Sequence, residues 1–253
     1  VNNVCQGGLS HQGGGIRSVN GSNPTIVSSV LYDNEPAQID FYYNEQDPAG
    51  VTISYSNIEG GQDSIVTYDN GTINWGAGNI DVDPLFVSAS ENNFHLFATS
   101  QMINSGHPDS LDADGSVADM GAYFYENNYV GPTWYVSESG NNATATGEVG
   151  NPFRSIQAGI NFASDFDSVA VASGIYVENI NFKGKTIKVA GAGSENTIID
   201  GNQNEGVVTF EGENEGYAAS DEAKLALLKG FTLQNGLDTA MTWPRGHGGG
   251  IFL

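Results

Sequence analysis

The feature of the sequence that most restricts its fold is a set of short strand-like runs that recur along the chain. Residues 25–34 (TIVSSVLYDN) and 51–61 (VTISYSNIEGG) read alike, because each has a β-branched run, then serine, then an asparagine-bearing turn. Similar runs lie at 168–177, 186–191, 197–201, 207–212 and 225–236. Apolar residues alternate within each run, so one set faces inward. A spacing of roughly 20 to 25 residues is typical of one coil of a β-solenoid, which buries its inner face by stacking on the next coil.

The composition agrees with an all-β chain that turns often. There are 34 glycines, and only 15 % of the residues are charged. The 30 acidic residues outnumber the 8 basic ones, which gives a formal net charge of −22. Such a surface repels nucleic acid and anionic membranes, and it suits high salt or divalent cations that screen its self-repulsion. We therefore expect that the chain does not bind nucleic acid and does not insert directly into a membrane. The lone Cys5 can form no internal disulfide.

A sandwich of antiparallel hairpins is the competing fold. It is less favoured because tight two-residue hairpin turns are not the dominant connections. One helix is predicted over 152–163 (PFRSIQAGINFA), with Asn151 as N-cap and Pro152 at the first helical position. Its expected apolar face is Phe153, Ile156, Ile160 and Ala163, and its expected polar face is Gln157 and Asn161. Such a helix would cover the otherwise open first coil of a solenoid.

Two segments carry motifs that resemble the pectate-lyase-like parallel β-helix family of bacterial secreted and surface proteins. Residues 134–201 contain WYVSESG, NPFRSIQAGI and GIYVENINFKGK, and resemble the start of such a domain. Residues 80–123 contain DPLF, HLFATSQMINSG and DADGSVADMGAY, and resemble the end of one. The resemblance implies a right-handed parallel β-helix in two segments with a short cap helix. It does not imply one reaction, because the family includes lyases, adhesins and other surface proteins.

The order of these motifs predicts the domain organisation. Residues 1–128 would be the C-terminal part of one β-helix domain with its closing cap, 129–132 a linker, and 133–253 the N-terminal part of a second domain. Both caps then lie mid-chain, and both ends are uncapped coils, carrying the similar runs HQGGGI (11–16) and HGGGI (247–251). Either the sequence is cut from a tandem array, or these ends dock on neighbouring copies. Docking end to end would give a head-to-tail fibre.

Clustered aspartates are the candidate metal ligands. Asp112, Asp114 and Asp119 surround a turn that contains Gly115, and hard oxygen ligands at alternate turn positions suit calcium. The run lacks a closing bidentate glutamate, so the alternative is a cap whose carboxylates accept backbone N–H bonds. Asp81 and Asp83 form a second cluster, for which strand-flanking turn residues are the alternative.

A polysaccharide lyase would need a base beside the uronate and a cation on its carboxylate. Arg245 and His247 are the best-placed pair for this role, with exposed loop residues as the alternative, whereas Lys183 and Lys185 lie in a turn near the cap. Asn20, Asn70 and Asn142 each begin a glycosylation triplet.

The sequence therefore favours an extracellular or cell-surface structural or adhesive protein that binds copies of itself, with calcium as a possible cofactor. The alternative is a lyase or carbohydrate-binding module for acidic polysaccharides.

Overall fold

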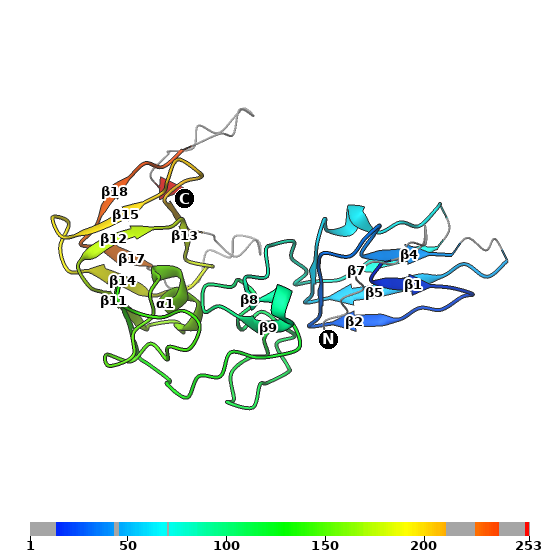
Figure 1. Cartoon of the computed structure of the whole chain (residues 1–253), viewed down its shortest axis with the longest axis horizontal. Coiled ribbons are helices and arrows are strands. Elements are labelled where there is room, and N and C mark those ends of the chain that lie inside the picture. Colours follow the sequence, from blue (N-terminus) through cyan, green and yellow to red (C-terminus); the bar gives the residue numbers. More distant parts are fainter. Residues whose placement is uncertain (1–13, 43–45, 70, 211–225, 238–250, 253) are drawn as a thin grey trace, which may run out of the picture. The chain divides into compact units, whose positions relative to one another are not determined.

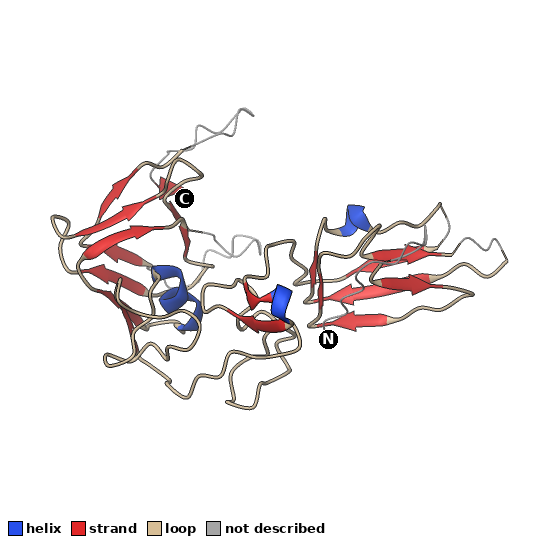
Figure 2. Cartoon of the chain, in the orientation of Figure 1, coloured by secondary structure: helices blue, strands red, loops and turns tan. Residues whose placement is uncertain are grey.

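The computed structural model describes residues 14–42, 46–69, 71–210, 226–237 and 251–252, and residues 251–252 are described by their backbone alone. The chain divides into two compact units, Val1–Glu126 and Asn127–Leu253. Strands dominate both units, and almost all of the strand pairs are parallel (Figures 1 and 2). The all-β class is therefore confirmed, and the antiparallel sandwich is not observed.

In the first unit, seven short strands form three parallel sheets. The sheets are β1–β4, β2–β5–β7 and β3–β6. The strands are β1 Ile16–Ser18, β2 Thr25–Val27, β3 Val30–Leu31, β4 Ile39–Phe41, β5 Gly50–Ser54, β6 Asn57–Ile58 and β7 Thr72–Trp75. Thr25 pairs with Thr52 and Ile26 with Ile53, so the two runs that read alike lie side by side in register. The predicted strands at 25–34 and 51–61 are confirmed.

The inward side chains of these strands form one apolar core. Ile39, Phe41, Val51, Ile53 and Ile58 are fully buried in it. The chain turns between β2 and β3 at Ser28 and between β5 and β6 at Tyr55, and both residues have left-handed backbone conformations (φ 48° each). The same sharp bend therefore recurs at the same place in successive turns of the chain.

The first unit continues into an irregular segment. It contains the 3₁₀ turn Ala89–Glu91 and an antiparallel pair, β8 Phe86–Ser88 with β9 Asn93–Leu96, whereas the 3₁₀ turn Gln62–Ser64 lies earlier, between β6 and β7. The segment returns to the β2–β3 turn, where His107 N–H donates to Ser28 Oγ (2.9 Å) and Gly121 N–H donates to Ser28 O (3.0 Å).

In the second unit, the chain visits three parallel sheets in the same order three times. The sheets are β10–β11–β14–β17, β12–β15–β18 and β13–β16–β19. Their strands are β10 Thr133–Val136, β11 Ser168–Val171, β12 Gly174–Val177, β13 Ile180–Asn181, β14 Lys188–Gly191, β15 Thr197–Asp200, β16 Val208–Thr209, β17 Leu227–Lys229, β18 Thr232–Gln234 and β19 Ile251–Phe252. Val169, Val189 and Ile199 are fully buried on the inner faces.

The helix of the second unit, α1 Ile156–Phe162, is shorter than predicted. Residues expected as its first turn are extended instead: Phe153 pairs with Val136, its N–H bonding Tyr135 O (2.9 Å). The apolar face is confirmed within α1 at Ile156 and Ile160, and Phe153 and Ala163 are also buried but lie outside the helix. Asn161 was wrongly expected on a polar face, since it is 2 % exposed. A Cβ on Gly159 would lie 2.7 Å from Val169 Cγ1, so this glycine allows α1 to pack closely on the strands.

Candidate functional site

The predicted metal-binding aspartates lie in one turn and bond to backbone N–H groups. Asp119 accepts from Asn104 N–H (2.7 Å) through Oδ1 and from Tyr125 N–H (2.8 Å) through Oδ2. Asp112 Oδ2 accepts from Asp119 N–H (2.8 Å). Asp114 Oδ1 accepts from the N–H and the hydroxyl of Ser116 (3.0 and 2.6 Å). This is the cap arrangement that the sequence left open as the alternative to a calcium site.

Burial governs the electrostatics of this turn. Burial raises the pKa of Asp119 to about 7, although the two N–H bonds that it accepts act in the opposite direction. Burial also raises the pKa of Asp112, with a smaller contribution from the charge of Asp114. Within the described part of the chain, no group of three or more His, Cys, Asp or Glu side chains is placed to hold a metal ion. A calcium site at Asp112, Asp114 and Asp119 stays a prediction.

The second acidic pair also bonds to backbone. Asp81 Oδ1 accepts from Gly60 N–H (3.0 Å), which belongs to the preceding turn of the chain. Asp83 Oδ1 accepts from Leu85 N–H (2.9 Å) two residues on. These contacts are those of turn residues that flank strands.

The other predicted site residues are spread over the molecule. Asn20 is exposed in the turn after β1. Asn142 is half-buried, and its Nδ2 donates to Ser155 Oγ (2.8 Å). Asn70, Arg245 and His247 lie outside the described residues. Asn20 and Asn142 therefore belong to different units of the chain.

Sequence reasoning missed how the N-terminus of α1 is held. Its N-cap, Ser155, makes no side-chain capping bond. Instead Asn142 Oδ1 accepts from the N–H groups of Arg154 (2.9 Å) and Ser155 (3.2 Å). The Glu178 carboxylate accepts from Ile156 N–H (2.8 Å) and Gln157 N–H (3.0 Å). A carboxylate is favourable at this positive end of the helix dipole.

The C-terminus of α1 is held by a lysine from the same coil as Glu178. Lys185 Nζ donates to the carbonyl oxygens of Ile160, Asn161 and Ala163, each at 2.8 Å. Burial lowers the pKa of Lys185 to about 7, and the charge of Lys183 acts in the same direction. Glu178 and Lys185 belong to the ENINFKGK motif, so a motif noted for its resemblance fixes both ends of the helix.

One shallow groove of about 420 Å³ lies in the second unit. Its walls are small or apolar, and they include Tyr135, Val149, Ala170, Ala172, Ala190 and Ala192. The described residues that line it include no Asp, Glu, Lys, Arg or His. The groove therefore lacks the base and the carboxylates that a uronate lyase needs.

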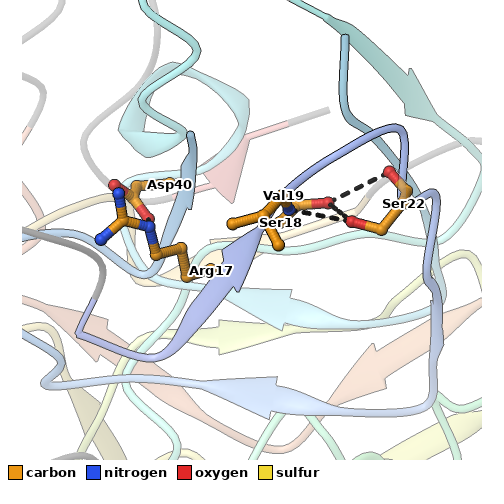
Figure 3. Close-up of polar contacts among 5 residues, drawn as sticks. All are labelled: Arg17, Ser18, Val19, Ser22 and Asp40. Atoms are coloured by element: carbon orange, nitrogen blue, oxygen red, sulfur yellow. Dashed lines mark hydrogen bonds and ion pairs between the residues drawn. The ribbon is translucent and has the colours of Figure 1, made fainter. Parts of the chain in front are cut away.

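In the first unit, a buried carboxylate faces an arginine across two paired strands. Arg17 of β1 and Asp40 of β4 are register partners, and Arg17 Nε lies 3.8 Å from Asp40 Oδ1 (Figure 3). Asp40 is 2 % exposed, and neither of its oxygens has a hydrogen bond to the described residues. Beside them, Ser18 Oγ lies 2.8 Å from Ser22 Oγ and donates to Gly50 O (3.1 Å). The ion pair therefore holds β1 against β4, and the hydrogen bonds of Ser18 hold the turn that follows β1.

Each unit also has three consecutive strands whose outer edges pair with no described strand. In the first unit these are the edges of β1, β2 and β3, each of which ends its sheet. In the second unit they are the edges of β17, β18 and β19. The inward Leu228 and Leu233 are only half-buried, whereas their partners one coil earlier, Val189 and Ile199, are fully buried. Strands β17 and β18 therefore leave apolar surface and backbone hydrogen-bonding groups uncovered by described residues.

Comparison of the chain with protein-family models, with curated proteins and with solved structures found no match. Among the described residues, no helix has the length and apolar character needed to span a membrane.

Proposed function

We propose that this chain is a structural unit of a secreted or cell-surface assembly, built as two segments of right-handed parallel β-helix. The repeated visiting order of three parallel sheets in the second unit supports the β-helix interpretation. The motifs at 80–123 and 134–201 that resemble pectate-lyase-like proteins support it from the sequence. The helix α1, which contacts β10, β11 and β13, acts as the cap of the second segment.

The observation that carries the structural role is that, among the described residues, the outer edges of β1, β2 and β3 and of β17, β18 and β19 pair with no strand. Parallel strands with unpaired N–H and C=O groups are templates for strands of another chain. A contact between the first coil of one copy and the last coil of another is heterologous, so it extends into a filament unless it closes into a ring. Copies of the same chain are therefore the proposed partners.

The net charge of −22 bears on where such an assembly forms. Strong self-repulsion between acidic copies requires screening by salt or by divalent cations such as calcium. Salt and calcium at screening concentrations are typical of an extracellular surface. Without them, a chain of this charge would repel acidic polymers as well as its own copies. Calcium in this proposal is a screening or cap-binding ion, not a catalytic one.

Carbohydrate binding is the second candidate, and the groove beside Tyr135 is the observation that favours it. An aromatic side chain with small neighbours can stack on a sugar ring. Lyase activity is tested separately by incubating the chain with uronate polymers and calcium. Formation of unsaturated product would overturn the structural assignment in favour of an enzyme.

Light scattering over a concentration series tests the structural role. We expect the mass-averaged size of the purified, folded chain to rise continuously with concentration, since a non-closing contact has no preferred number of copies. A size equal to one chain at every concentration, in salt and calcium, would contradict the proposal.

A further inference from the structure

We propose that residues 178–185 form a proton-dependent strap along α1, which holds the helix least tightly near neutral pH. The inference concerns contacts inside the second unit alone, so it does not depend on the proposed function. Three sets of polar contacts tie the strap to the helix, and two of them involve side chains that gain or lose a proton. The strap therefore combines fixed geometry with a dependence on pH.

The strap follows α1 from one end to the other. At the start of the helix, the two oxygens of Glu178 accept from Ile156 N–H (2.8 Å) and Gln157 N–H (3.0 Å). At its end, Lys185 Nζ donates to three backbone carbonyl oxygens, each at 2.8 Å. Between them, the Gln157 side chain donates to Asn181 O (3.1 Å) and accepts from Asn181 N–H (2.7 Å). The strap thus holds a helix whose N-cap residue makes no side-chain capping bond.

Two opposing effects decide how these contacts respond to pH. Bonds to the backbone favour the charged forms, because Glu178 accepts two N–H bonds and the three protons of a charged Lys185 match three carbonyl oxygens. Removal from water disfavours the charged forms, since neither side chain has an ion pair with a described residue. Burial is the larger effect at both groups. It raises the pKa of Glu178 from 4.5 to about 7 and lowers that of Lys185 from 10.5 to about 7.

The groups around Glu178 carry no compensating positive charge. Within α1 no side chain is ionisable, and Arg154, which precedes the helix, is exposed. Burial raises the pKa of the Tyr176 phenol to about 12, and the charges of Glu138 and Glu178 add to that rise, so the phenol stays neutral. Asp200 accepts the Glu178 N–H with its backbone carbonyl (3.0 Å), and its carboxylate bonds to residues of the next coil.

The charges around Lys185 act in both directions. Lys183 lowers the pKa of Lys185 further, whereas Asp165 and Asp167 raise it by less than burial lowers it. Asp165 Oδ1 accepts from Thr186 N–H (2.7 Å), so this carboxylate is itself fixed on the backbone. Lys185 therefore loses its proton more readily in the folded chain than in the unfolded chain.

The sign of the pH dependence follows from proton binding in the two states. Between pH 4.5 and 7, the folded chain keeps a proton on Glu178 that the unfolded chain has lost, so stability falls as the pH rises. Between pH 7 and 10.5, the unfolded chain keeps a proton on Lys185 that the folded chain has lost, so stability rises with pH. The two slopes meet near pH 7. Most proteins are instead at their most stable between about pH 5 and 8.

Native-state hydrogen exchange of the whole chain tests the strap, read by mass spectrometry in a peptide that covers residues 156–163. Dividing each exchange rate by the intrinsic rate at the same pH gives the equilibrium constant for opening of the helix. We expect this constant to be at least about tenfold larger at pH 7 than at pH 5 or pH 9. A constant that does not change with pH would overturn the proposal. A constant that is smallest at pH 7 would also overturn it, because the hydrogen bonds would then outweigh burial.

Two variants assign each slope to one side chain. Glu178→Gln should remove the change between pH 5 and 7 and keep the change above pH 7. Lys185→Arg, which keeps a charged donor at every pH, should do the reverse. Glu205→Gln and Lys188→Gln, at exposed positions, are the matched controls and should follow the wild type. A maximum of opening at pH 7 that persists when Glu178→Gln and Lys185→Arg are combined would overturn the proposal, because other groups would then cause it.

Discussion

Asp119 and Lys185 are buried charged side chains that bond to backbone groups, and each satisfies several backbone donors or acceptors at once. Asp119 accepts two N–H bonds, and Lys185 donates to three carbonyl oxygens. A buried backbone group without a partner costs about 1–3 kcal/mol. Such side chains therefore stabilise irregular segments that have no strand ladder of their own.

Replacing Asp119 tests this role at the residue scale. We expect Asp119→Ala to lower the free energy of unfolding of the first unit by about 2–4 kcal/mol, because two buried N–H groups lose their acceptor. Denaturant unfolding in the presence of a chelator measures the difference without metal. Asp83→Ala, which removes one exposed local bond to Leu85 N–H, is the matched control and should cost less than about 1 kcal/mol.

The outcome also separates the two interpretations of the acidic turn. If wild type and Asp119→Ala unfold alike in chelator and differ only when calcium is added, the carboxylate is a metal ligand and its backbone bonds contribute little.

At the scale of elements, α1 is fixed by residues distant in the sequence. Asn142 and Glu178 accept the N–H groups at its start, and Lys185 contacts its last carbonyls. A helix of seven residues is not stable by itself in water, so these contacts and the packing of its apolar face decide that it forms.

The pH dependence of the second unit tests the Glu178 contact. Burial raises the pKa of Glu178 from 4.5 to about 7. The folded state then binds more protons than the unfolded state between these values, so this group's contribution to stability is present below pH 4.5 and is lost as the pH rises through 7. In wild type we expect this decline in the free energy of unfolding to be about 1–3 kcal/mol between pH 4.5 and 7. The glutamine side chain of Glu178→Gln is neutral at every pH, so this variant should lack the decline.

Thermal or denaturant unfolding of both chains over that pH range measures the effect. Glu205→Gln, at an exposed glutamate, is the matched control and should follow the wild type. A Glu178→Gln chain with the same slope as wild type would show that another group carries the pH dependence.

The sequence predicted the strands well and the start of the helix poorly, for one physical reason. Strand positions follow from local alternation, and Ile26, Ile53 and Ile199 lie inward as that alternation requires. Asn151 and Pro152 are a good local start signal for a helix, but pairing of Phe153 with Val136 overrides it. Pairing and capping partners more than ten residues away are not visible in local patterns.

The same limit applies to the candidate sites. Aspartates in a turn predict either a metal site or a cap, and which N–H groups lie nearby decides between them. The buried Asp40 gave no signal in the sequence, because its burial depends on strands that pair 23 residues apart, from Arg17 to Asp40. Glu178 and Lys185 belong to a motif that the sequence shows, but only the structure shows that both side chains bond to α1.

At the scale of the whole molecule, a short parallel ladder must overcome repulsion between copies that each carry a net charge of −22. Each copy would offer three strands of two or three residues at either junction. The Debye length falls from about 10 Å at 0.1 M salt to about 3 Å at 1 M. Assembly should therefore depend strongly on ionic strength.

We expect assembly to be promoted by salt, with the dissociation constant of the contact between copies falling at least about tenfold between 0.01 M and 0.5 M sodium chloride because screening removes the repulsion. Sedimentation of the assembled fraction measures it. A charge change at an exposed residue outside the strands that form these edges, Asp63→Asn, should lower that dissociation constant slightly. Assembly that weakens as salt rises would show that attraction between charges, not strand pairing, joins the copies.

Electron microscopy of the purified chain at physiological salt tests the central claim most directly. If the sheets extend from copy to copy, the chain should form filaments in which one copy makes one axial repeat. A Leu228→Asp chain, which carries a charge on the inward face of β17, should not form them. Folded wild-type chains that remain discrete particles of one copy at all concentrations would contradict the account.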